Sequence, residues 1–223
     1  VRLAISDILR PVSFTRLGDF KIYMIPAEER ESYYLDPEPL FLKKIDEIFE
    51  KMKKLRRETY RKVSTAEVTL INHDSSSKKN LSAKITGLKN INLVITSPPY
   101  GDSRTTVAYG EFSWFSNRIL RIASEIRQGD LDKKLMGGKK RNYPKILDLG
   151  SMNKILKKIN KKRRKEVKNF FLEYQRSIRN VSEMLNSEGI CCYVVGNRNV
   201  DGQTIPMDEF TRLCFEHYGL LHV

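Results

Sequence analysis

Apolar residues recur at helical spacing in two long segments of the chain. In the first segment they are Phe41, Ile45, Ile48, Met52 and Leu55. In the second, which begins near residue 161, they are Val167, Phe171, Tyr174, Ile178, Val181 and Leu185. Steps of three and four residues place such side chains on one face of a helix. We therefore predict two amphipathic helices packed on a core, and further helices over 1–10, about 111–127, and after residue 204.

Short apolar runs predict strands between these helices. The runs at 91–96 and 190–197 are almost uninterrupted, which is typical of strands covered on both faces of a parallel sheet. Residues 20–25 and 67–72 predict two further strands, 26–39 a loop, and 186–189 the stop of the second long helix. Strand, helix, strand, helix is the order of a doubly wound α/β fold. We expect a mostly parallel sheet with flanking helices.

The chain of 223 residues divides in this interpretation into two parts. Residues 1–64 form an N-terminal segment with the first long helix, and residues 65–223 form an α/β region. Within that region, about 101–160 is long for a connection and is rich in lysine and arginine, with aromatic residues between them. Long connections in compact domains are usually functional. Basic residues suit phosphates and aromatic residues suit unstacked bases, so this insertion is a candidate nucleic-acid contact.

Charge and composition narrow the class of protein. Lysine and arginine number 41 against 27 acidic residues, a net charge of +14 that favours a polyanionic partner such as nucleic acid. The alternative is a lysine-rich surface that only solvates the protein. The three cysteines (Cys191, Cys192 and Cys214) and the three scattered histidines lack metal-ligand spacing, so we expect no metal and no disulfide framework. No apolar run reaches the roughly 20 residues that span a bilayer, and we expect a cytoplasmic protein without a membrane partner.

The most specific motif is Thr96-Ser97-Pro98-Pro99-Tyr100-Gly101, directly after the predicted strand at 91–96. We call Ser97, Pro98, Pro99 and Tyr100 the ledge, because two prolines hold a polar and an aromatic side chain rigidly at a strand end. In open α/β sheets, ligands bind at the carboxyl ends of the strands. The alternative interpretation is an ordinary loop, since Pro-Pro after a strand is also a common loop start.

The ledge closely resembles the catalytic Ser-Pro-Pro-Tyr motif of S-adenosylmethionine-dependent DNA amino-methyltransferases, above all those that methylate N4 of cytosine. The resemblance covers roughly residues 65–223, with a looser likeness in 1–26. It implies a Rossmann-like, class I methyltransferase fold, in which 65–223 is the catalytic region. It also implies S-adenosylmethionine as cofactor, duplex DNA as substrate, and a restriction–modification system with a cognate restriction endonuclease. Ser97, where relatives have Asp or Asn, favours cytosine over adenine as a family tendency.

The chemistry of amino-group methylation explains why such residues are needed. The exocyclic amine is a poor nucleophile, because its lone pair is delocalised into the ring. The resemblance implies that the Ser97 hydroxyl oxygen and the Pro98 carbonyl accept hydrogen bonds from the amine and stabilise the charge that develops on nitrogen. Pro99 would stiffen the ledge, and Tyr100 would stack on a base flipped out of the duplex. The amine would then attack the methyl group in line, with positioning doing most of the work.

The cofactor side is less complete in the sequence. In related methyltransferases an acidic residue at the end of the preceding strand lies near the cofactor adenine, and Asp74 matches that position. The alternative is that Asp74 only caps the following turn. A glycine-rich loop resembling Asp-Pro-Phe-x-Gly-x-Gly is not found. The nearest match begins at Ile146 and ends at Gly150-Ser151, with Met152 and Asn153 where glycine should follow. We therefore expect a further segment or a second chain to supply this loop.

Two rival functions stay open. The first keeps the enzyme class and changes the acceptor, to N6 of adenine or to an amine in RNA or in a protein side chain. The second is a non-catalytic or split subunit that only binds nucleic acid, which the incomplete glycine-rich loop favours.

Overall fold

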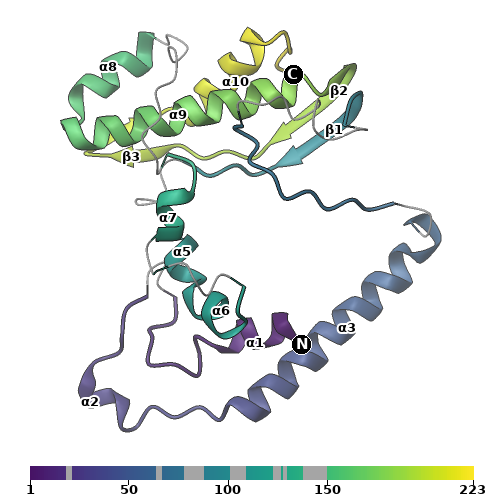
Figure 1. Ribbon diagram of the computed structural model, residues 1–223, viewed down its shortest axis with the longest axis vertical. Helices are drawn as coiled ribbons and strands as arrows, with labels where there is room; N and C mark the ends of the chain where they lie inside the picture. The colour runs from purple at the N-terminus through teal and green to yellow at the C-terminus, as the bar shows by residue number, and fades with distance from the viewer. Residues whose placement is uncertain are drawn as a thin grey trace. The chain divides into compact units, whose positions relative to one another are not determined.

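The computed structural model describes residues 1–18, 22–63, 67–77, 88–100, 109–122, 127, 130–137 and 150–223. The chain divides into two compact units, one of residues 1–71 and 107–131 and the other of residues 72–106 and 132–223 (Figure 1). The boundary expected between residues 64 and 65 stays a prediction. Among the residues described, no helix combines the length and the apolar character needed to cross a membrane.

The first unit is helical in its described part. It contains α1 (Arg2–Ile8), α2 (Ala27–Arg30), α3 (Pro37–Val63), α5 (Tyr109–Phe112) and α6 (Trp114–Ile119). The helix predicted over 1–10 is confirmed. The one predicted over about 111–127 is interrupted, because α6 ends at Ile119 and Arg121 takes a left-handed conformation with φ of 54°. The strand predicted at 20–25 is wrong for its described residues, since only an isolated bridge joins Thr15 and Met24.

The first long amphipathic helix is confirmed as α3, but its apolar face does not pack on a core along its whole length. Helix α3 begins at Pro37, because proline suits the first helical turn. The loop predicted at 26–39 is therefore wrong in part, since it contains α2 and the start of α3. Helix α1 packs along α3, and Lys44 of α3 lies 3.4 Å from Asp7 of α1. The apolar face is half-buried at Phe41, yet Met52 and Leu55 farther along it are exposed. The prediction that the whole face packs on a core is therefore wrong for this end of the helix.

The helices of the second unit follow the predicted pattern closely. Helix α9 (Lys161–Ser182) buries the expected apolar positions from Val167 to Val181, whereas Leu185 lies in a strand beyond the helix. Helix α10 (Met207–His217) confirms the helix after residue 204. Helix α7 (Asp130–Lys134) spans the boundary of the units, and α8 (Gly150–Lys158) lies in the second. Phe170, Tyr174 and Phe210 are fully buried, and the rings of Phe171 and Phe210 lie 4.5 Å apart. These contacts join α9 and α10 into one core.

A small parallel sheet lies against these helices (Figure 1). Strand β1 (Ile91–Thr96) pairs in parallel with β2 (Leu185–Tyr193), which confirms the two central strand predictions and a mixed α/β architecture. The helix stop predicted at 186–189 is wrong, because Ile91 pairs with Leu185 and the strand begins there with an irregular register. The strand predicted at 67–72 is also wrong. Val68 and Leu70 are exposed and belong to no described sheet, so alternation without a partner strand forms no ladder.

A β-hairpin between β2 and α10 was not predicted. Strand β3 (Arg198–Val200) pairs antiparallel with β4 (Gln203–Ile205). The turn consists of Asp201 and Gly202 with φ of 50° and 72°, which is the Asp-Gly turn that favours a two-residue hairpin. Val200 and Ile205 are buried in the core of the second unit. The apolar run at 190–197 was predicted to be a strand over its whole length, but β2 ends at Tyr193.

Gly137 offers a test of packing in this unit. Its φ is +81°, its N–H donates to the buried Glu173 Oε2 at 2.6 Å, and an added Cβ would lie 3.0 Å from the Phe170 Cβ. We expect Gly137→Ala to lower the free energy of unfolding by about 2–3 kcal/mol, from left-handed strain and overpacking together. Gly202→Ala is the control, because its φ of +72° carries similar strain but open space surrounds it. Its expected cost is about 1 kcal/mol in urea unfolding. Equal costs for both variants would contradict the packing described.

Candidate functional site

The ledge lies where the two parallel strands end. It follows β1 directly, and residues 194–198 follow β2 at the same edge of the sheet. Thr96 is paired with Tyr193, and the Val194 N–H donates to the Thr96 carbonyl oxygen at 2.9 Å. The expected position of the motif at the carboxyl end of a strand is therefore confirmed, and this is the edge at which ligands bind in open α/β sheets.

Ser97 and Tyr100 are joined across the ledge. The Ser97 hydroxyl oxygen lies 2.8 Å from the Tyr100 hydroxyl oxygen, and either can donate. Ser97 is exposed, whereas Pro98 and Pro99 are half-buried. A hydroxyl has one donor and two acceptor positions. If Ser97 donates to Tyr100, its oxygen therefore retains acceptor capacity for an N–H group that approaches from solvent.

The ring of Tyr100 is seated on an apolar support. It borders a small pocket whose other apolar lining is Val167, Phe170, Phe171, Val200, Ile205 and Met207. The backbone of Gly196 lies beside the ring, since a Cβ added there would be 3.7–3.9 Å from three of its atoms. Tyr100 nevertheless keeps 36% of its surface exposed. The ring is thus supported on the core side and accessible from outside.

The sequence interpretation missed the residues that follow β2. Gly196 lies beside the Tyr100 ring, and half-buried Arg198 lines the same pocket and brings a positive charge near the ledge. The Asn197 Oδ1 accepts from the Asp208 N–H at 3.1 Å, which ties this segment to the first turn of α10. The strand predicted at 190–197 was a usable signal, because residues after neighbouring parallel strands meet at one edge.

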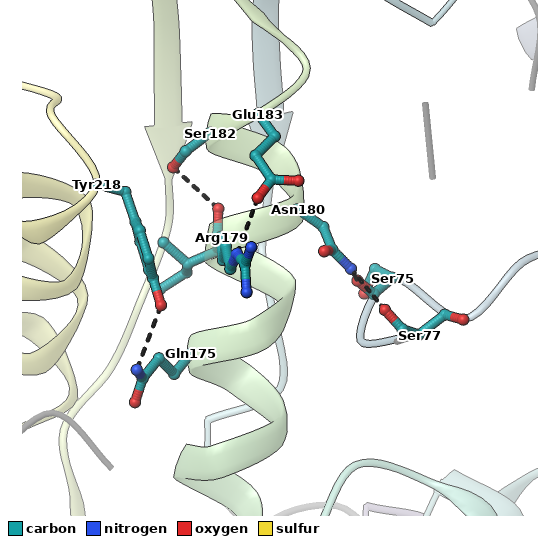
Figure 2. Close-up of polar contacts among 9 residues, drawn as sticks. Ser75, Ser77, Gln175, Arg179, Asn180, Ser182, Glu183 and Tyr218 are labelled. Carbon is teal, nitrogen blue, oxygen red and sulfur yellow. Dashed lines mark hydrogen bonds and ion pairs between the residues drawn. The ribbon is translucent and has the colours of Figure 1, made fainter. Parts of the chain in front are cut away.

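Asp74 lies in a turn, away from the ledge along α9. Its Oδ1 accepts from the Ser76 N–H at 2.9 Å and from the Ser76 hydroxyl at 2.7 Å, as expected if it caps the turn. Figure 2 shows Asn180 of α9 holding this turn, with Nδ2 donating to the Ser75 and Ser77 carbonyls at 2.7 and 3.1 Å. Asn180 is about 15 Å along α9 from Phe170 at the Tyr100 pocket. A contact of Asp74 with a cofactor stays a prediction.

The nearest match to a glycine-rich loop, at residues 146–153, is only partly described by the structure. Residues 146–149 of the nearest glycine-loop match lie outside the described residues. Gly150 begins α8 instead of a glycine turn, and Met152 is buried in the core. Within the part of the chain that the structure describes, no cluster of His, Cys, Asp or Glu has the arrangement of a metal site. No described residue is therefore assigned to the methionine part of a cofactor or to a metal.

Exposed lysines gather where α8 turns into α9. We call this set the basic corner, and it consists of Lys154, Lys157, Lys158, Lys161, Lys162, Lys165 and Lys168. The Arg164 Nη2 donates to the Lys157 and Ile159 carbonyls at 2.9 Å each, and the Asn160 Nδ2 donates to Asp201 at 2.6 Å. These hydrogen bonds fix the turn between α8 and α9 and, with it, the backbone that carries the basic corner. It shares the amino-terminal half of α9 with Phe170 and Phe171 of the Tyr100 pocket.

Comparison with known proteins gives one informative similarity. The chain is 30% identical over 231 residues to "Type II methyltransferase M.MvaI" of Kocuria varians. The match takes in 99% of this chain and 50% of the relative, so the chain spans about half the length of the curated relative it matches. No family model and no solved structure matches the chain. Similarity to a methyltransferase thus extends over the whole chain and agrees with a mixed α/β fold.

Proposed function

We propose that this chain forms the base-accepting side of a DNA methyltransferase that transfers a methyl group from S-adenosylmethionine to N4 of cytosine. The observation that carries the proposal is the Ser97–Tyr100 pair on a Pro-Pro ledge at the carboxyl end of β1. The similarity of the whole chain to half of a type II methyltransferase supports it. A Rossmann-like fold, with 65–223 as catalytic region, is part of the same proposal.

The ledge acts on the amino group of the target base. The Ser97 oxygen and the Pro98 carbonyl oxygen accept from the two amine N–H groups, while Ser97 donates its own proton to Tyr100. Acceptors so placed stabilise the positive charge that develops on nitrogen, and proline supplies no competing N–H. The cofactor, when bound, supplies an electrophilic methyl group. The described residues provide the acceptor side alone, with Asp74 as a proposed contact to the cofactor adenine.

The target base has to leave the duplex to reach the ledge, because its amino group is buried in the stack. Tyr100 stacks on the flipped base with the accessible part of its ring, and the apolar pocket holds the ring in position. Arg198 lines the same pocket, which places a positive charge near the ledge. The Tyr100 ring and the Ser97 hydroxyl thereby act on the same nucleotide.

The basic corner contacts the DNA backbone in this proposal. We expect replacement of Lys154, Lys157 and Lys158 by glutamine to weaken duplex binding similarly for all sequences. Since about 0.9 of a counterion is released for each phosphate contact, the salt dependence should fall by up to about 3 in log–log slope. Fluorescence anisotropy over a range of salt concentrations measures both effects.

The control for the lysine variant replaces Lys44, Lys53 and Lys54 of α3. It removes the same charge, but each of these lysines is paired with a carboxylate on the protein. We expect a smaller loss of affinity and a smaller change of slope. Equal losses from both triple variants would show that only net charge matters and would contradict a contact at the basic corner.

Mass spectrometry of nucleosides tests the proposed acceptor. Duplex DNA is incubated with the protein and S-adenosylmethionine carrying an isotopically labelled methyl group, then digested. We expect labelled N4-methylcytosine. Labelled N6-methyladenine would favour an adenine methyltransferase, the first rival function. Labelled methyl groups found in RNA or in protein, when these are offered as substrates, would favour the other forms of that rival.

A non-catalytic or split nucleic-acid-binding subunit is the second candidate, because no glycine-rich loop is identified in the described residues. Isothermal titration with S-adenosylmethionine separates it from the enzyme. Tight binding by this chain would argue against it, and absence of binding together with retained duplex binding would favour it. A cognate restriction endonuclease is a further proposed partner.

A further inference from the structure

The β-hairpin of β3 and β4 joins the Tyr100 pocket to the basic corner. At its open end, Arg198 is paired with Ile205, and both line the pocket beside the Tyr100 ring. At its tip, Asp201 accepts hydrogen bonds from Asn160, which lies in the turn between α8 and α9. Strand β3 lies along α9 between these two places (Figure 1). The two ends of the hairpin therefore contact both parts of the proposed DNA-binding surface.

The contact at the hairpin tip divides the tasks of the Asn160 side chain. The Asp201 Oδ2 accepts from the Asn160 backbone N–H at 2.9 Å and from its Nδ2 at 2.6 Å. The Asn160 Oδ1 accepts from the Arg163 N–H at 3.0 Å and caps α9. The amide oxygen thus holds the start of α9, and the amide nitrogen holds the hairpin. A carboxylate among lysines weakens their attraction for phosphate, so affinity for DNA does not explain why Asp201 is there.

The hairpin between its two ends is held firmly. Val200 and Ile205 are each 3% exposed and belong to the core of the second unit. On the exposed side of the hairpin, the Thr204 Oγ1 donates to the Asn199 Oδ1 at 2.9 Å and joins the two strands. The tip is three residues beyond Arg198, which at about 3.4 Å per residue places it about 10 Å from the Tyr100 pocket. The hairpin therefore sets a fixed distance between the pocket and the basic corner.

We propose that Asp201 is a positioning residue: its bond to Asn160 fixes the basic corner relative to the ledge, so that DNA held at the corner presents its target nucleotide to Tyr100. The inference rests on the proposed function, because the corner must contact phosphates and the ledge must receive the base. DNA rises by about 3.4 Å for each base pair, so about 10 Å corresponds to about three base pairs. The lysines beside Asn160 therefore contact phosphates about three base pairs from the flipped base.

Two single variants break this contact with opposite changes of charge. Asn160→Asp keeps an oxygen that caps α9 but places a second carboxylate opposite Asp201. Asp201→Gly removes the acceptor and one negative charge, and glycine suits the left-handed turn. We expect the rate of methyl transfer at saturating duplex DNA to fall by about tenfold or more in both, because the target nucleotide is misplaced. Affinity for the duplex should fall for Asn160→Asp and rise for Asp201→Gly, as their charges require.

Exchange of the two residues provides the rescue. The double variant Asn160→Asp with Asp201→Asn keeps the net charge of the unaltered protein and reverses the donor and the acceptor of the side-chain bond. Asparagine also suits the turn, since Asn-Gly favours the same hairpin. We expect transfer to recover to within about threefold of the unaltered protein. An unaltered rate in a single variant that folds in urea titration, or a double variant as slow as Asn160→Asp, would overturn the proposal. If Asn160→Asp does not fold, Asp201→Gly decides.

A second measurement locates the phosphate contact without methyl transfer. Duplexes carry one mismatched cytosine, which flips most readily, and one uncharged methylphosphonate linkage at a varied position. We expect the largest loss of affinity with the linkage about three base pairs from that cytosine, and a loss spread over neighbouring positions for Asp201→Gly.

The two measurements separate this proposal from the proposed function. A loss of affinity centred on the same linkage in both proteins, or independent of its position, would overturn the positioning role of Asp201. A contact that spreads in Asp201→Gly, without methyl transfer by the unaltered protein, would sink the proposed function alone. Methyl transfer that both single variants retain in full would sink the positioning role alone.

Discussion

Replacing Ser97 with alanine should lower the rate of methyl transfer by about 10²–10³-fold, the range typical for removal of one group that stabilises charge in a transition state. The Ser97 oxygen is exposed beside the Tyr100 hydroxyl at 2.8 Å and is the side-chain acceptor that the ledge presents. Without it, one amine N–H loses its partner as nitrogen becomes positive. Duplex binding should persist, since phosphate contacts supply most of the affinity.

Single-turnover transfer of a labelled methyl group to duplex DNA measures the Ser97→Ala effect, in the preparation in which the unaltered protein transfers methyl groups. Anisotropy on the same duplex measures binding. Ser32→Ala is a control, because Ser32 is an exposed serine in the other unit of the chain. Full transfer by the Ser97 variant, or equal loss in both variants, would contradict the assigned role.

Replacing Tyr100 should separate its ring from its hydroxyl. Stacking of a base on an aromatic side chain contributes about 1–3 kcal/mol, so Tyr100→Ala should lower methyl transfer by about fivefold to more than a hundredfold. Tyr100→Phe keeps the ring against Gly196 and the apolar pocket but removes the partner of the Ser97 hydroxyl. One neutral hydrogen bond is worth about 1 kcal/mol, so we expect a loss of about fivefold.

Fluorescence of 2-aminopurine at the target position measures the flipped state in the Tyr100 variants, beside the transfer rate. Tyr100→Ala should reduce the population stacked on the protein, whereas Tyr100→Phe should keep it. Equal effects of the two variants on flipping would contradict a stacking role for the ring. A fully active Tyr100→Ala protein would contradict the site altogether.

The sequence predicted the elements whose pattern is strong and local. The long 3.6-residue periodicity of α9 predicts one buried face, and this is confirmed. The apolar run of β1 correctly predicted a strand, but the prediction that it is covered on both faces is wrong for the described structure, because Leu93 and Ile95 are exposed. The predictions of α10 and of the ledge at the end of β1 are confirmed, since Pro98 and Pro99 stop the strand by themselves.

The wrong predictions concern segments whose structure depends on pairing with another strand, and the sequence alone does not identify that strand. Residues 67–72 have strand-like alternation, but a strand forms only against another strand, and Leu70 is 93% exposed. Residues 186–189 contain a glycine and an asparagine that suit a helix end, yet pairing of Ile91 with Leu185 extends β2 through them. The Asp201-Gly202 turn was a local signal, and the hairpin could have been predicted from it.

The sequence predicted the reactive residues of the site but not the residues that surround them. Ser97 and Tyr100 are three residues apart and their contact follows from a tight turn, whereas Gly196 and Arg198 reach Tyr100 only through the pairing of two strands. The role expected for Asp74 depended on a strand at 67–72 that does not form, and its turn packs on α9 instead. A prediction that two distant segments meet in one site is therefore correct only if the strands that carry them pair as assumed.

The central claim is that the ledge presents an acceptor to an amino group of cytosine. Its most direct test is the nucleoside product formed from labelled S-adenosylmethionine by the unaltered protein and by Ser97→Ala at equal occupancy of duplex DNA. The account predicts labelled N4-methylcytosine from the unaltered protein and at least about a hundredfold less from Ser97→Ala. Labelled N4-methylcytosine formed equally by both proteins, or label confined to another nucleoside, would contradict it.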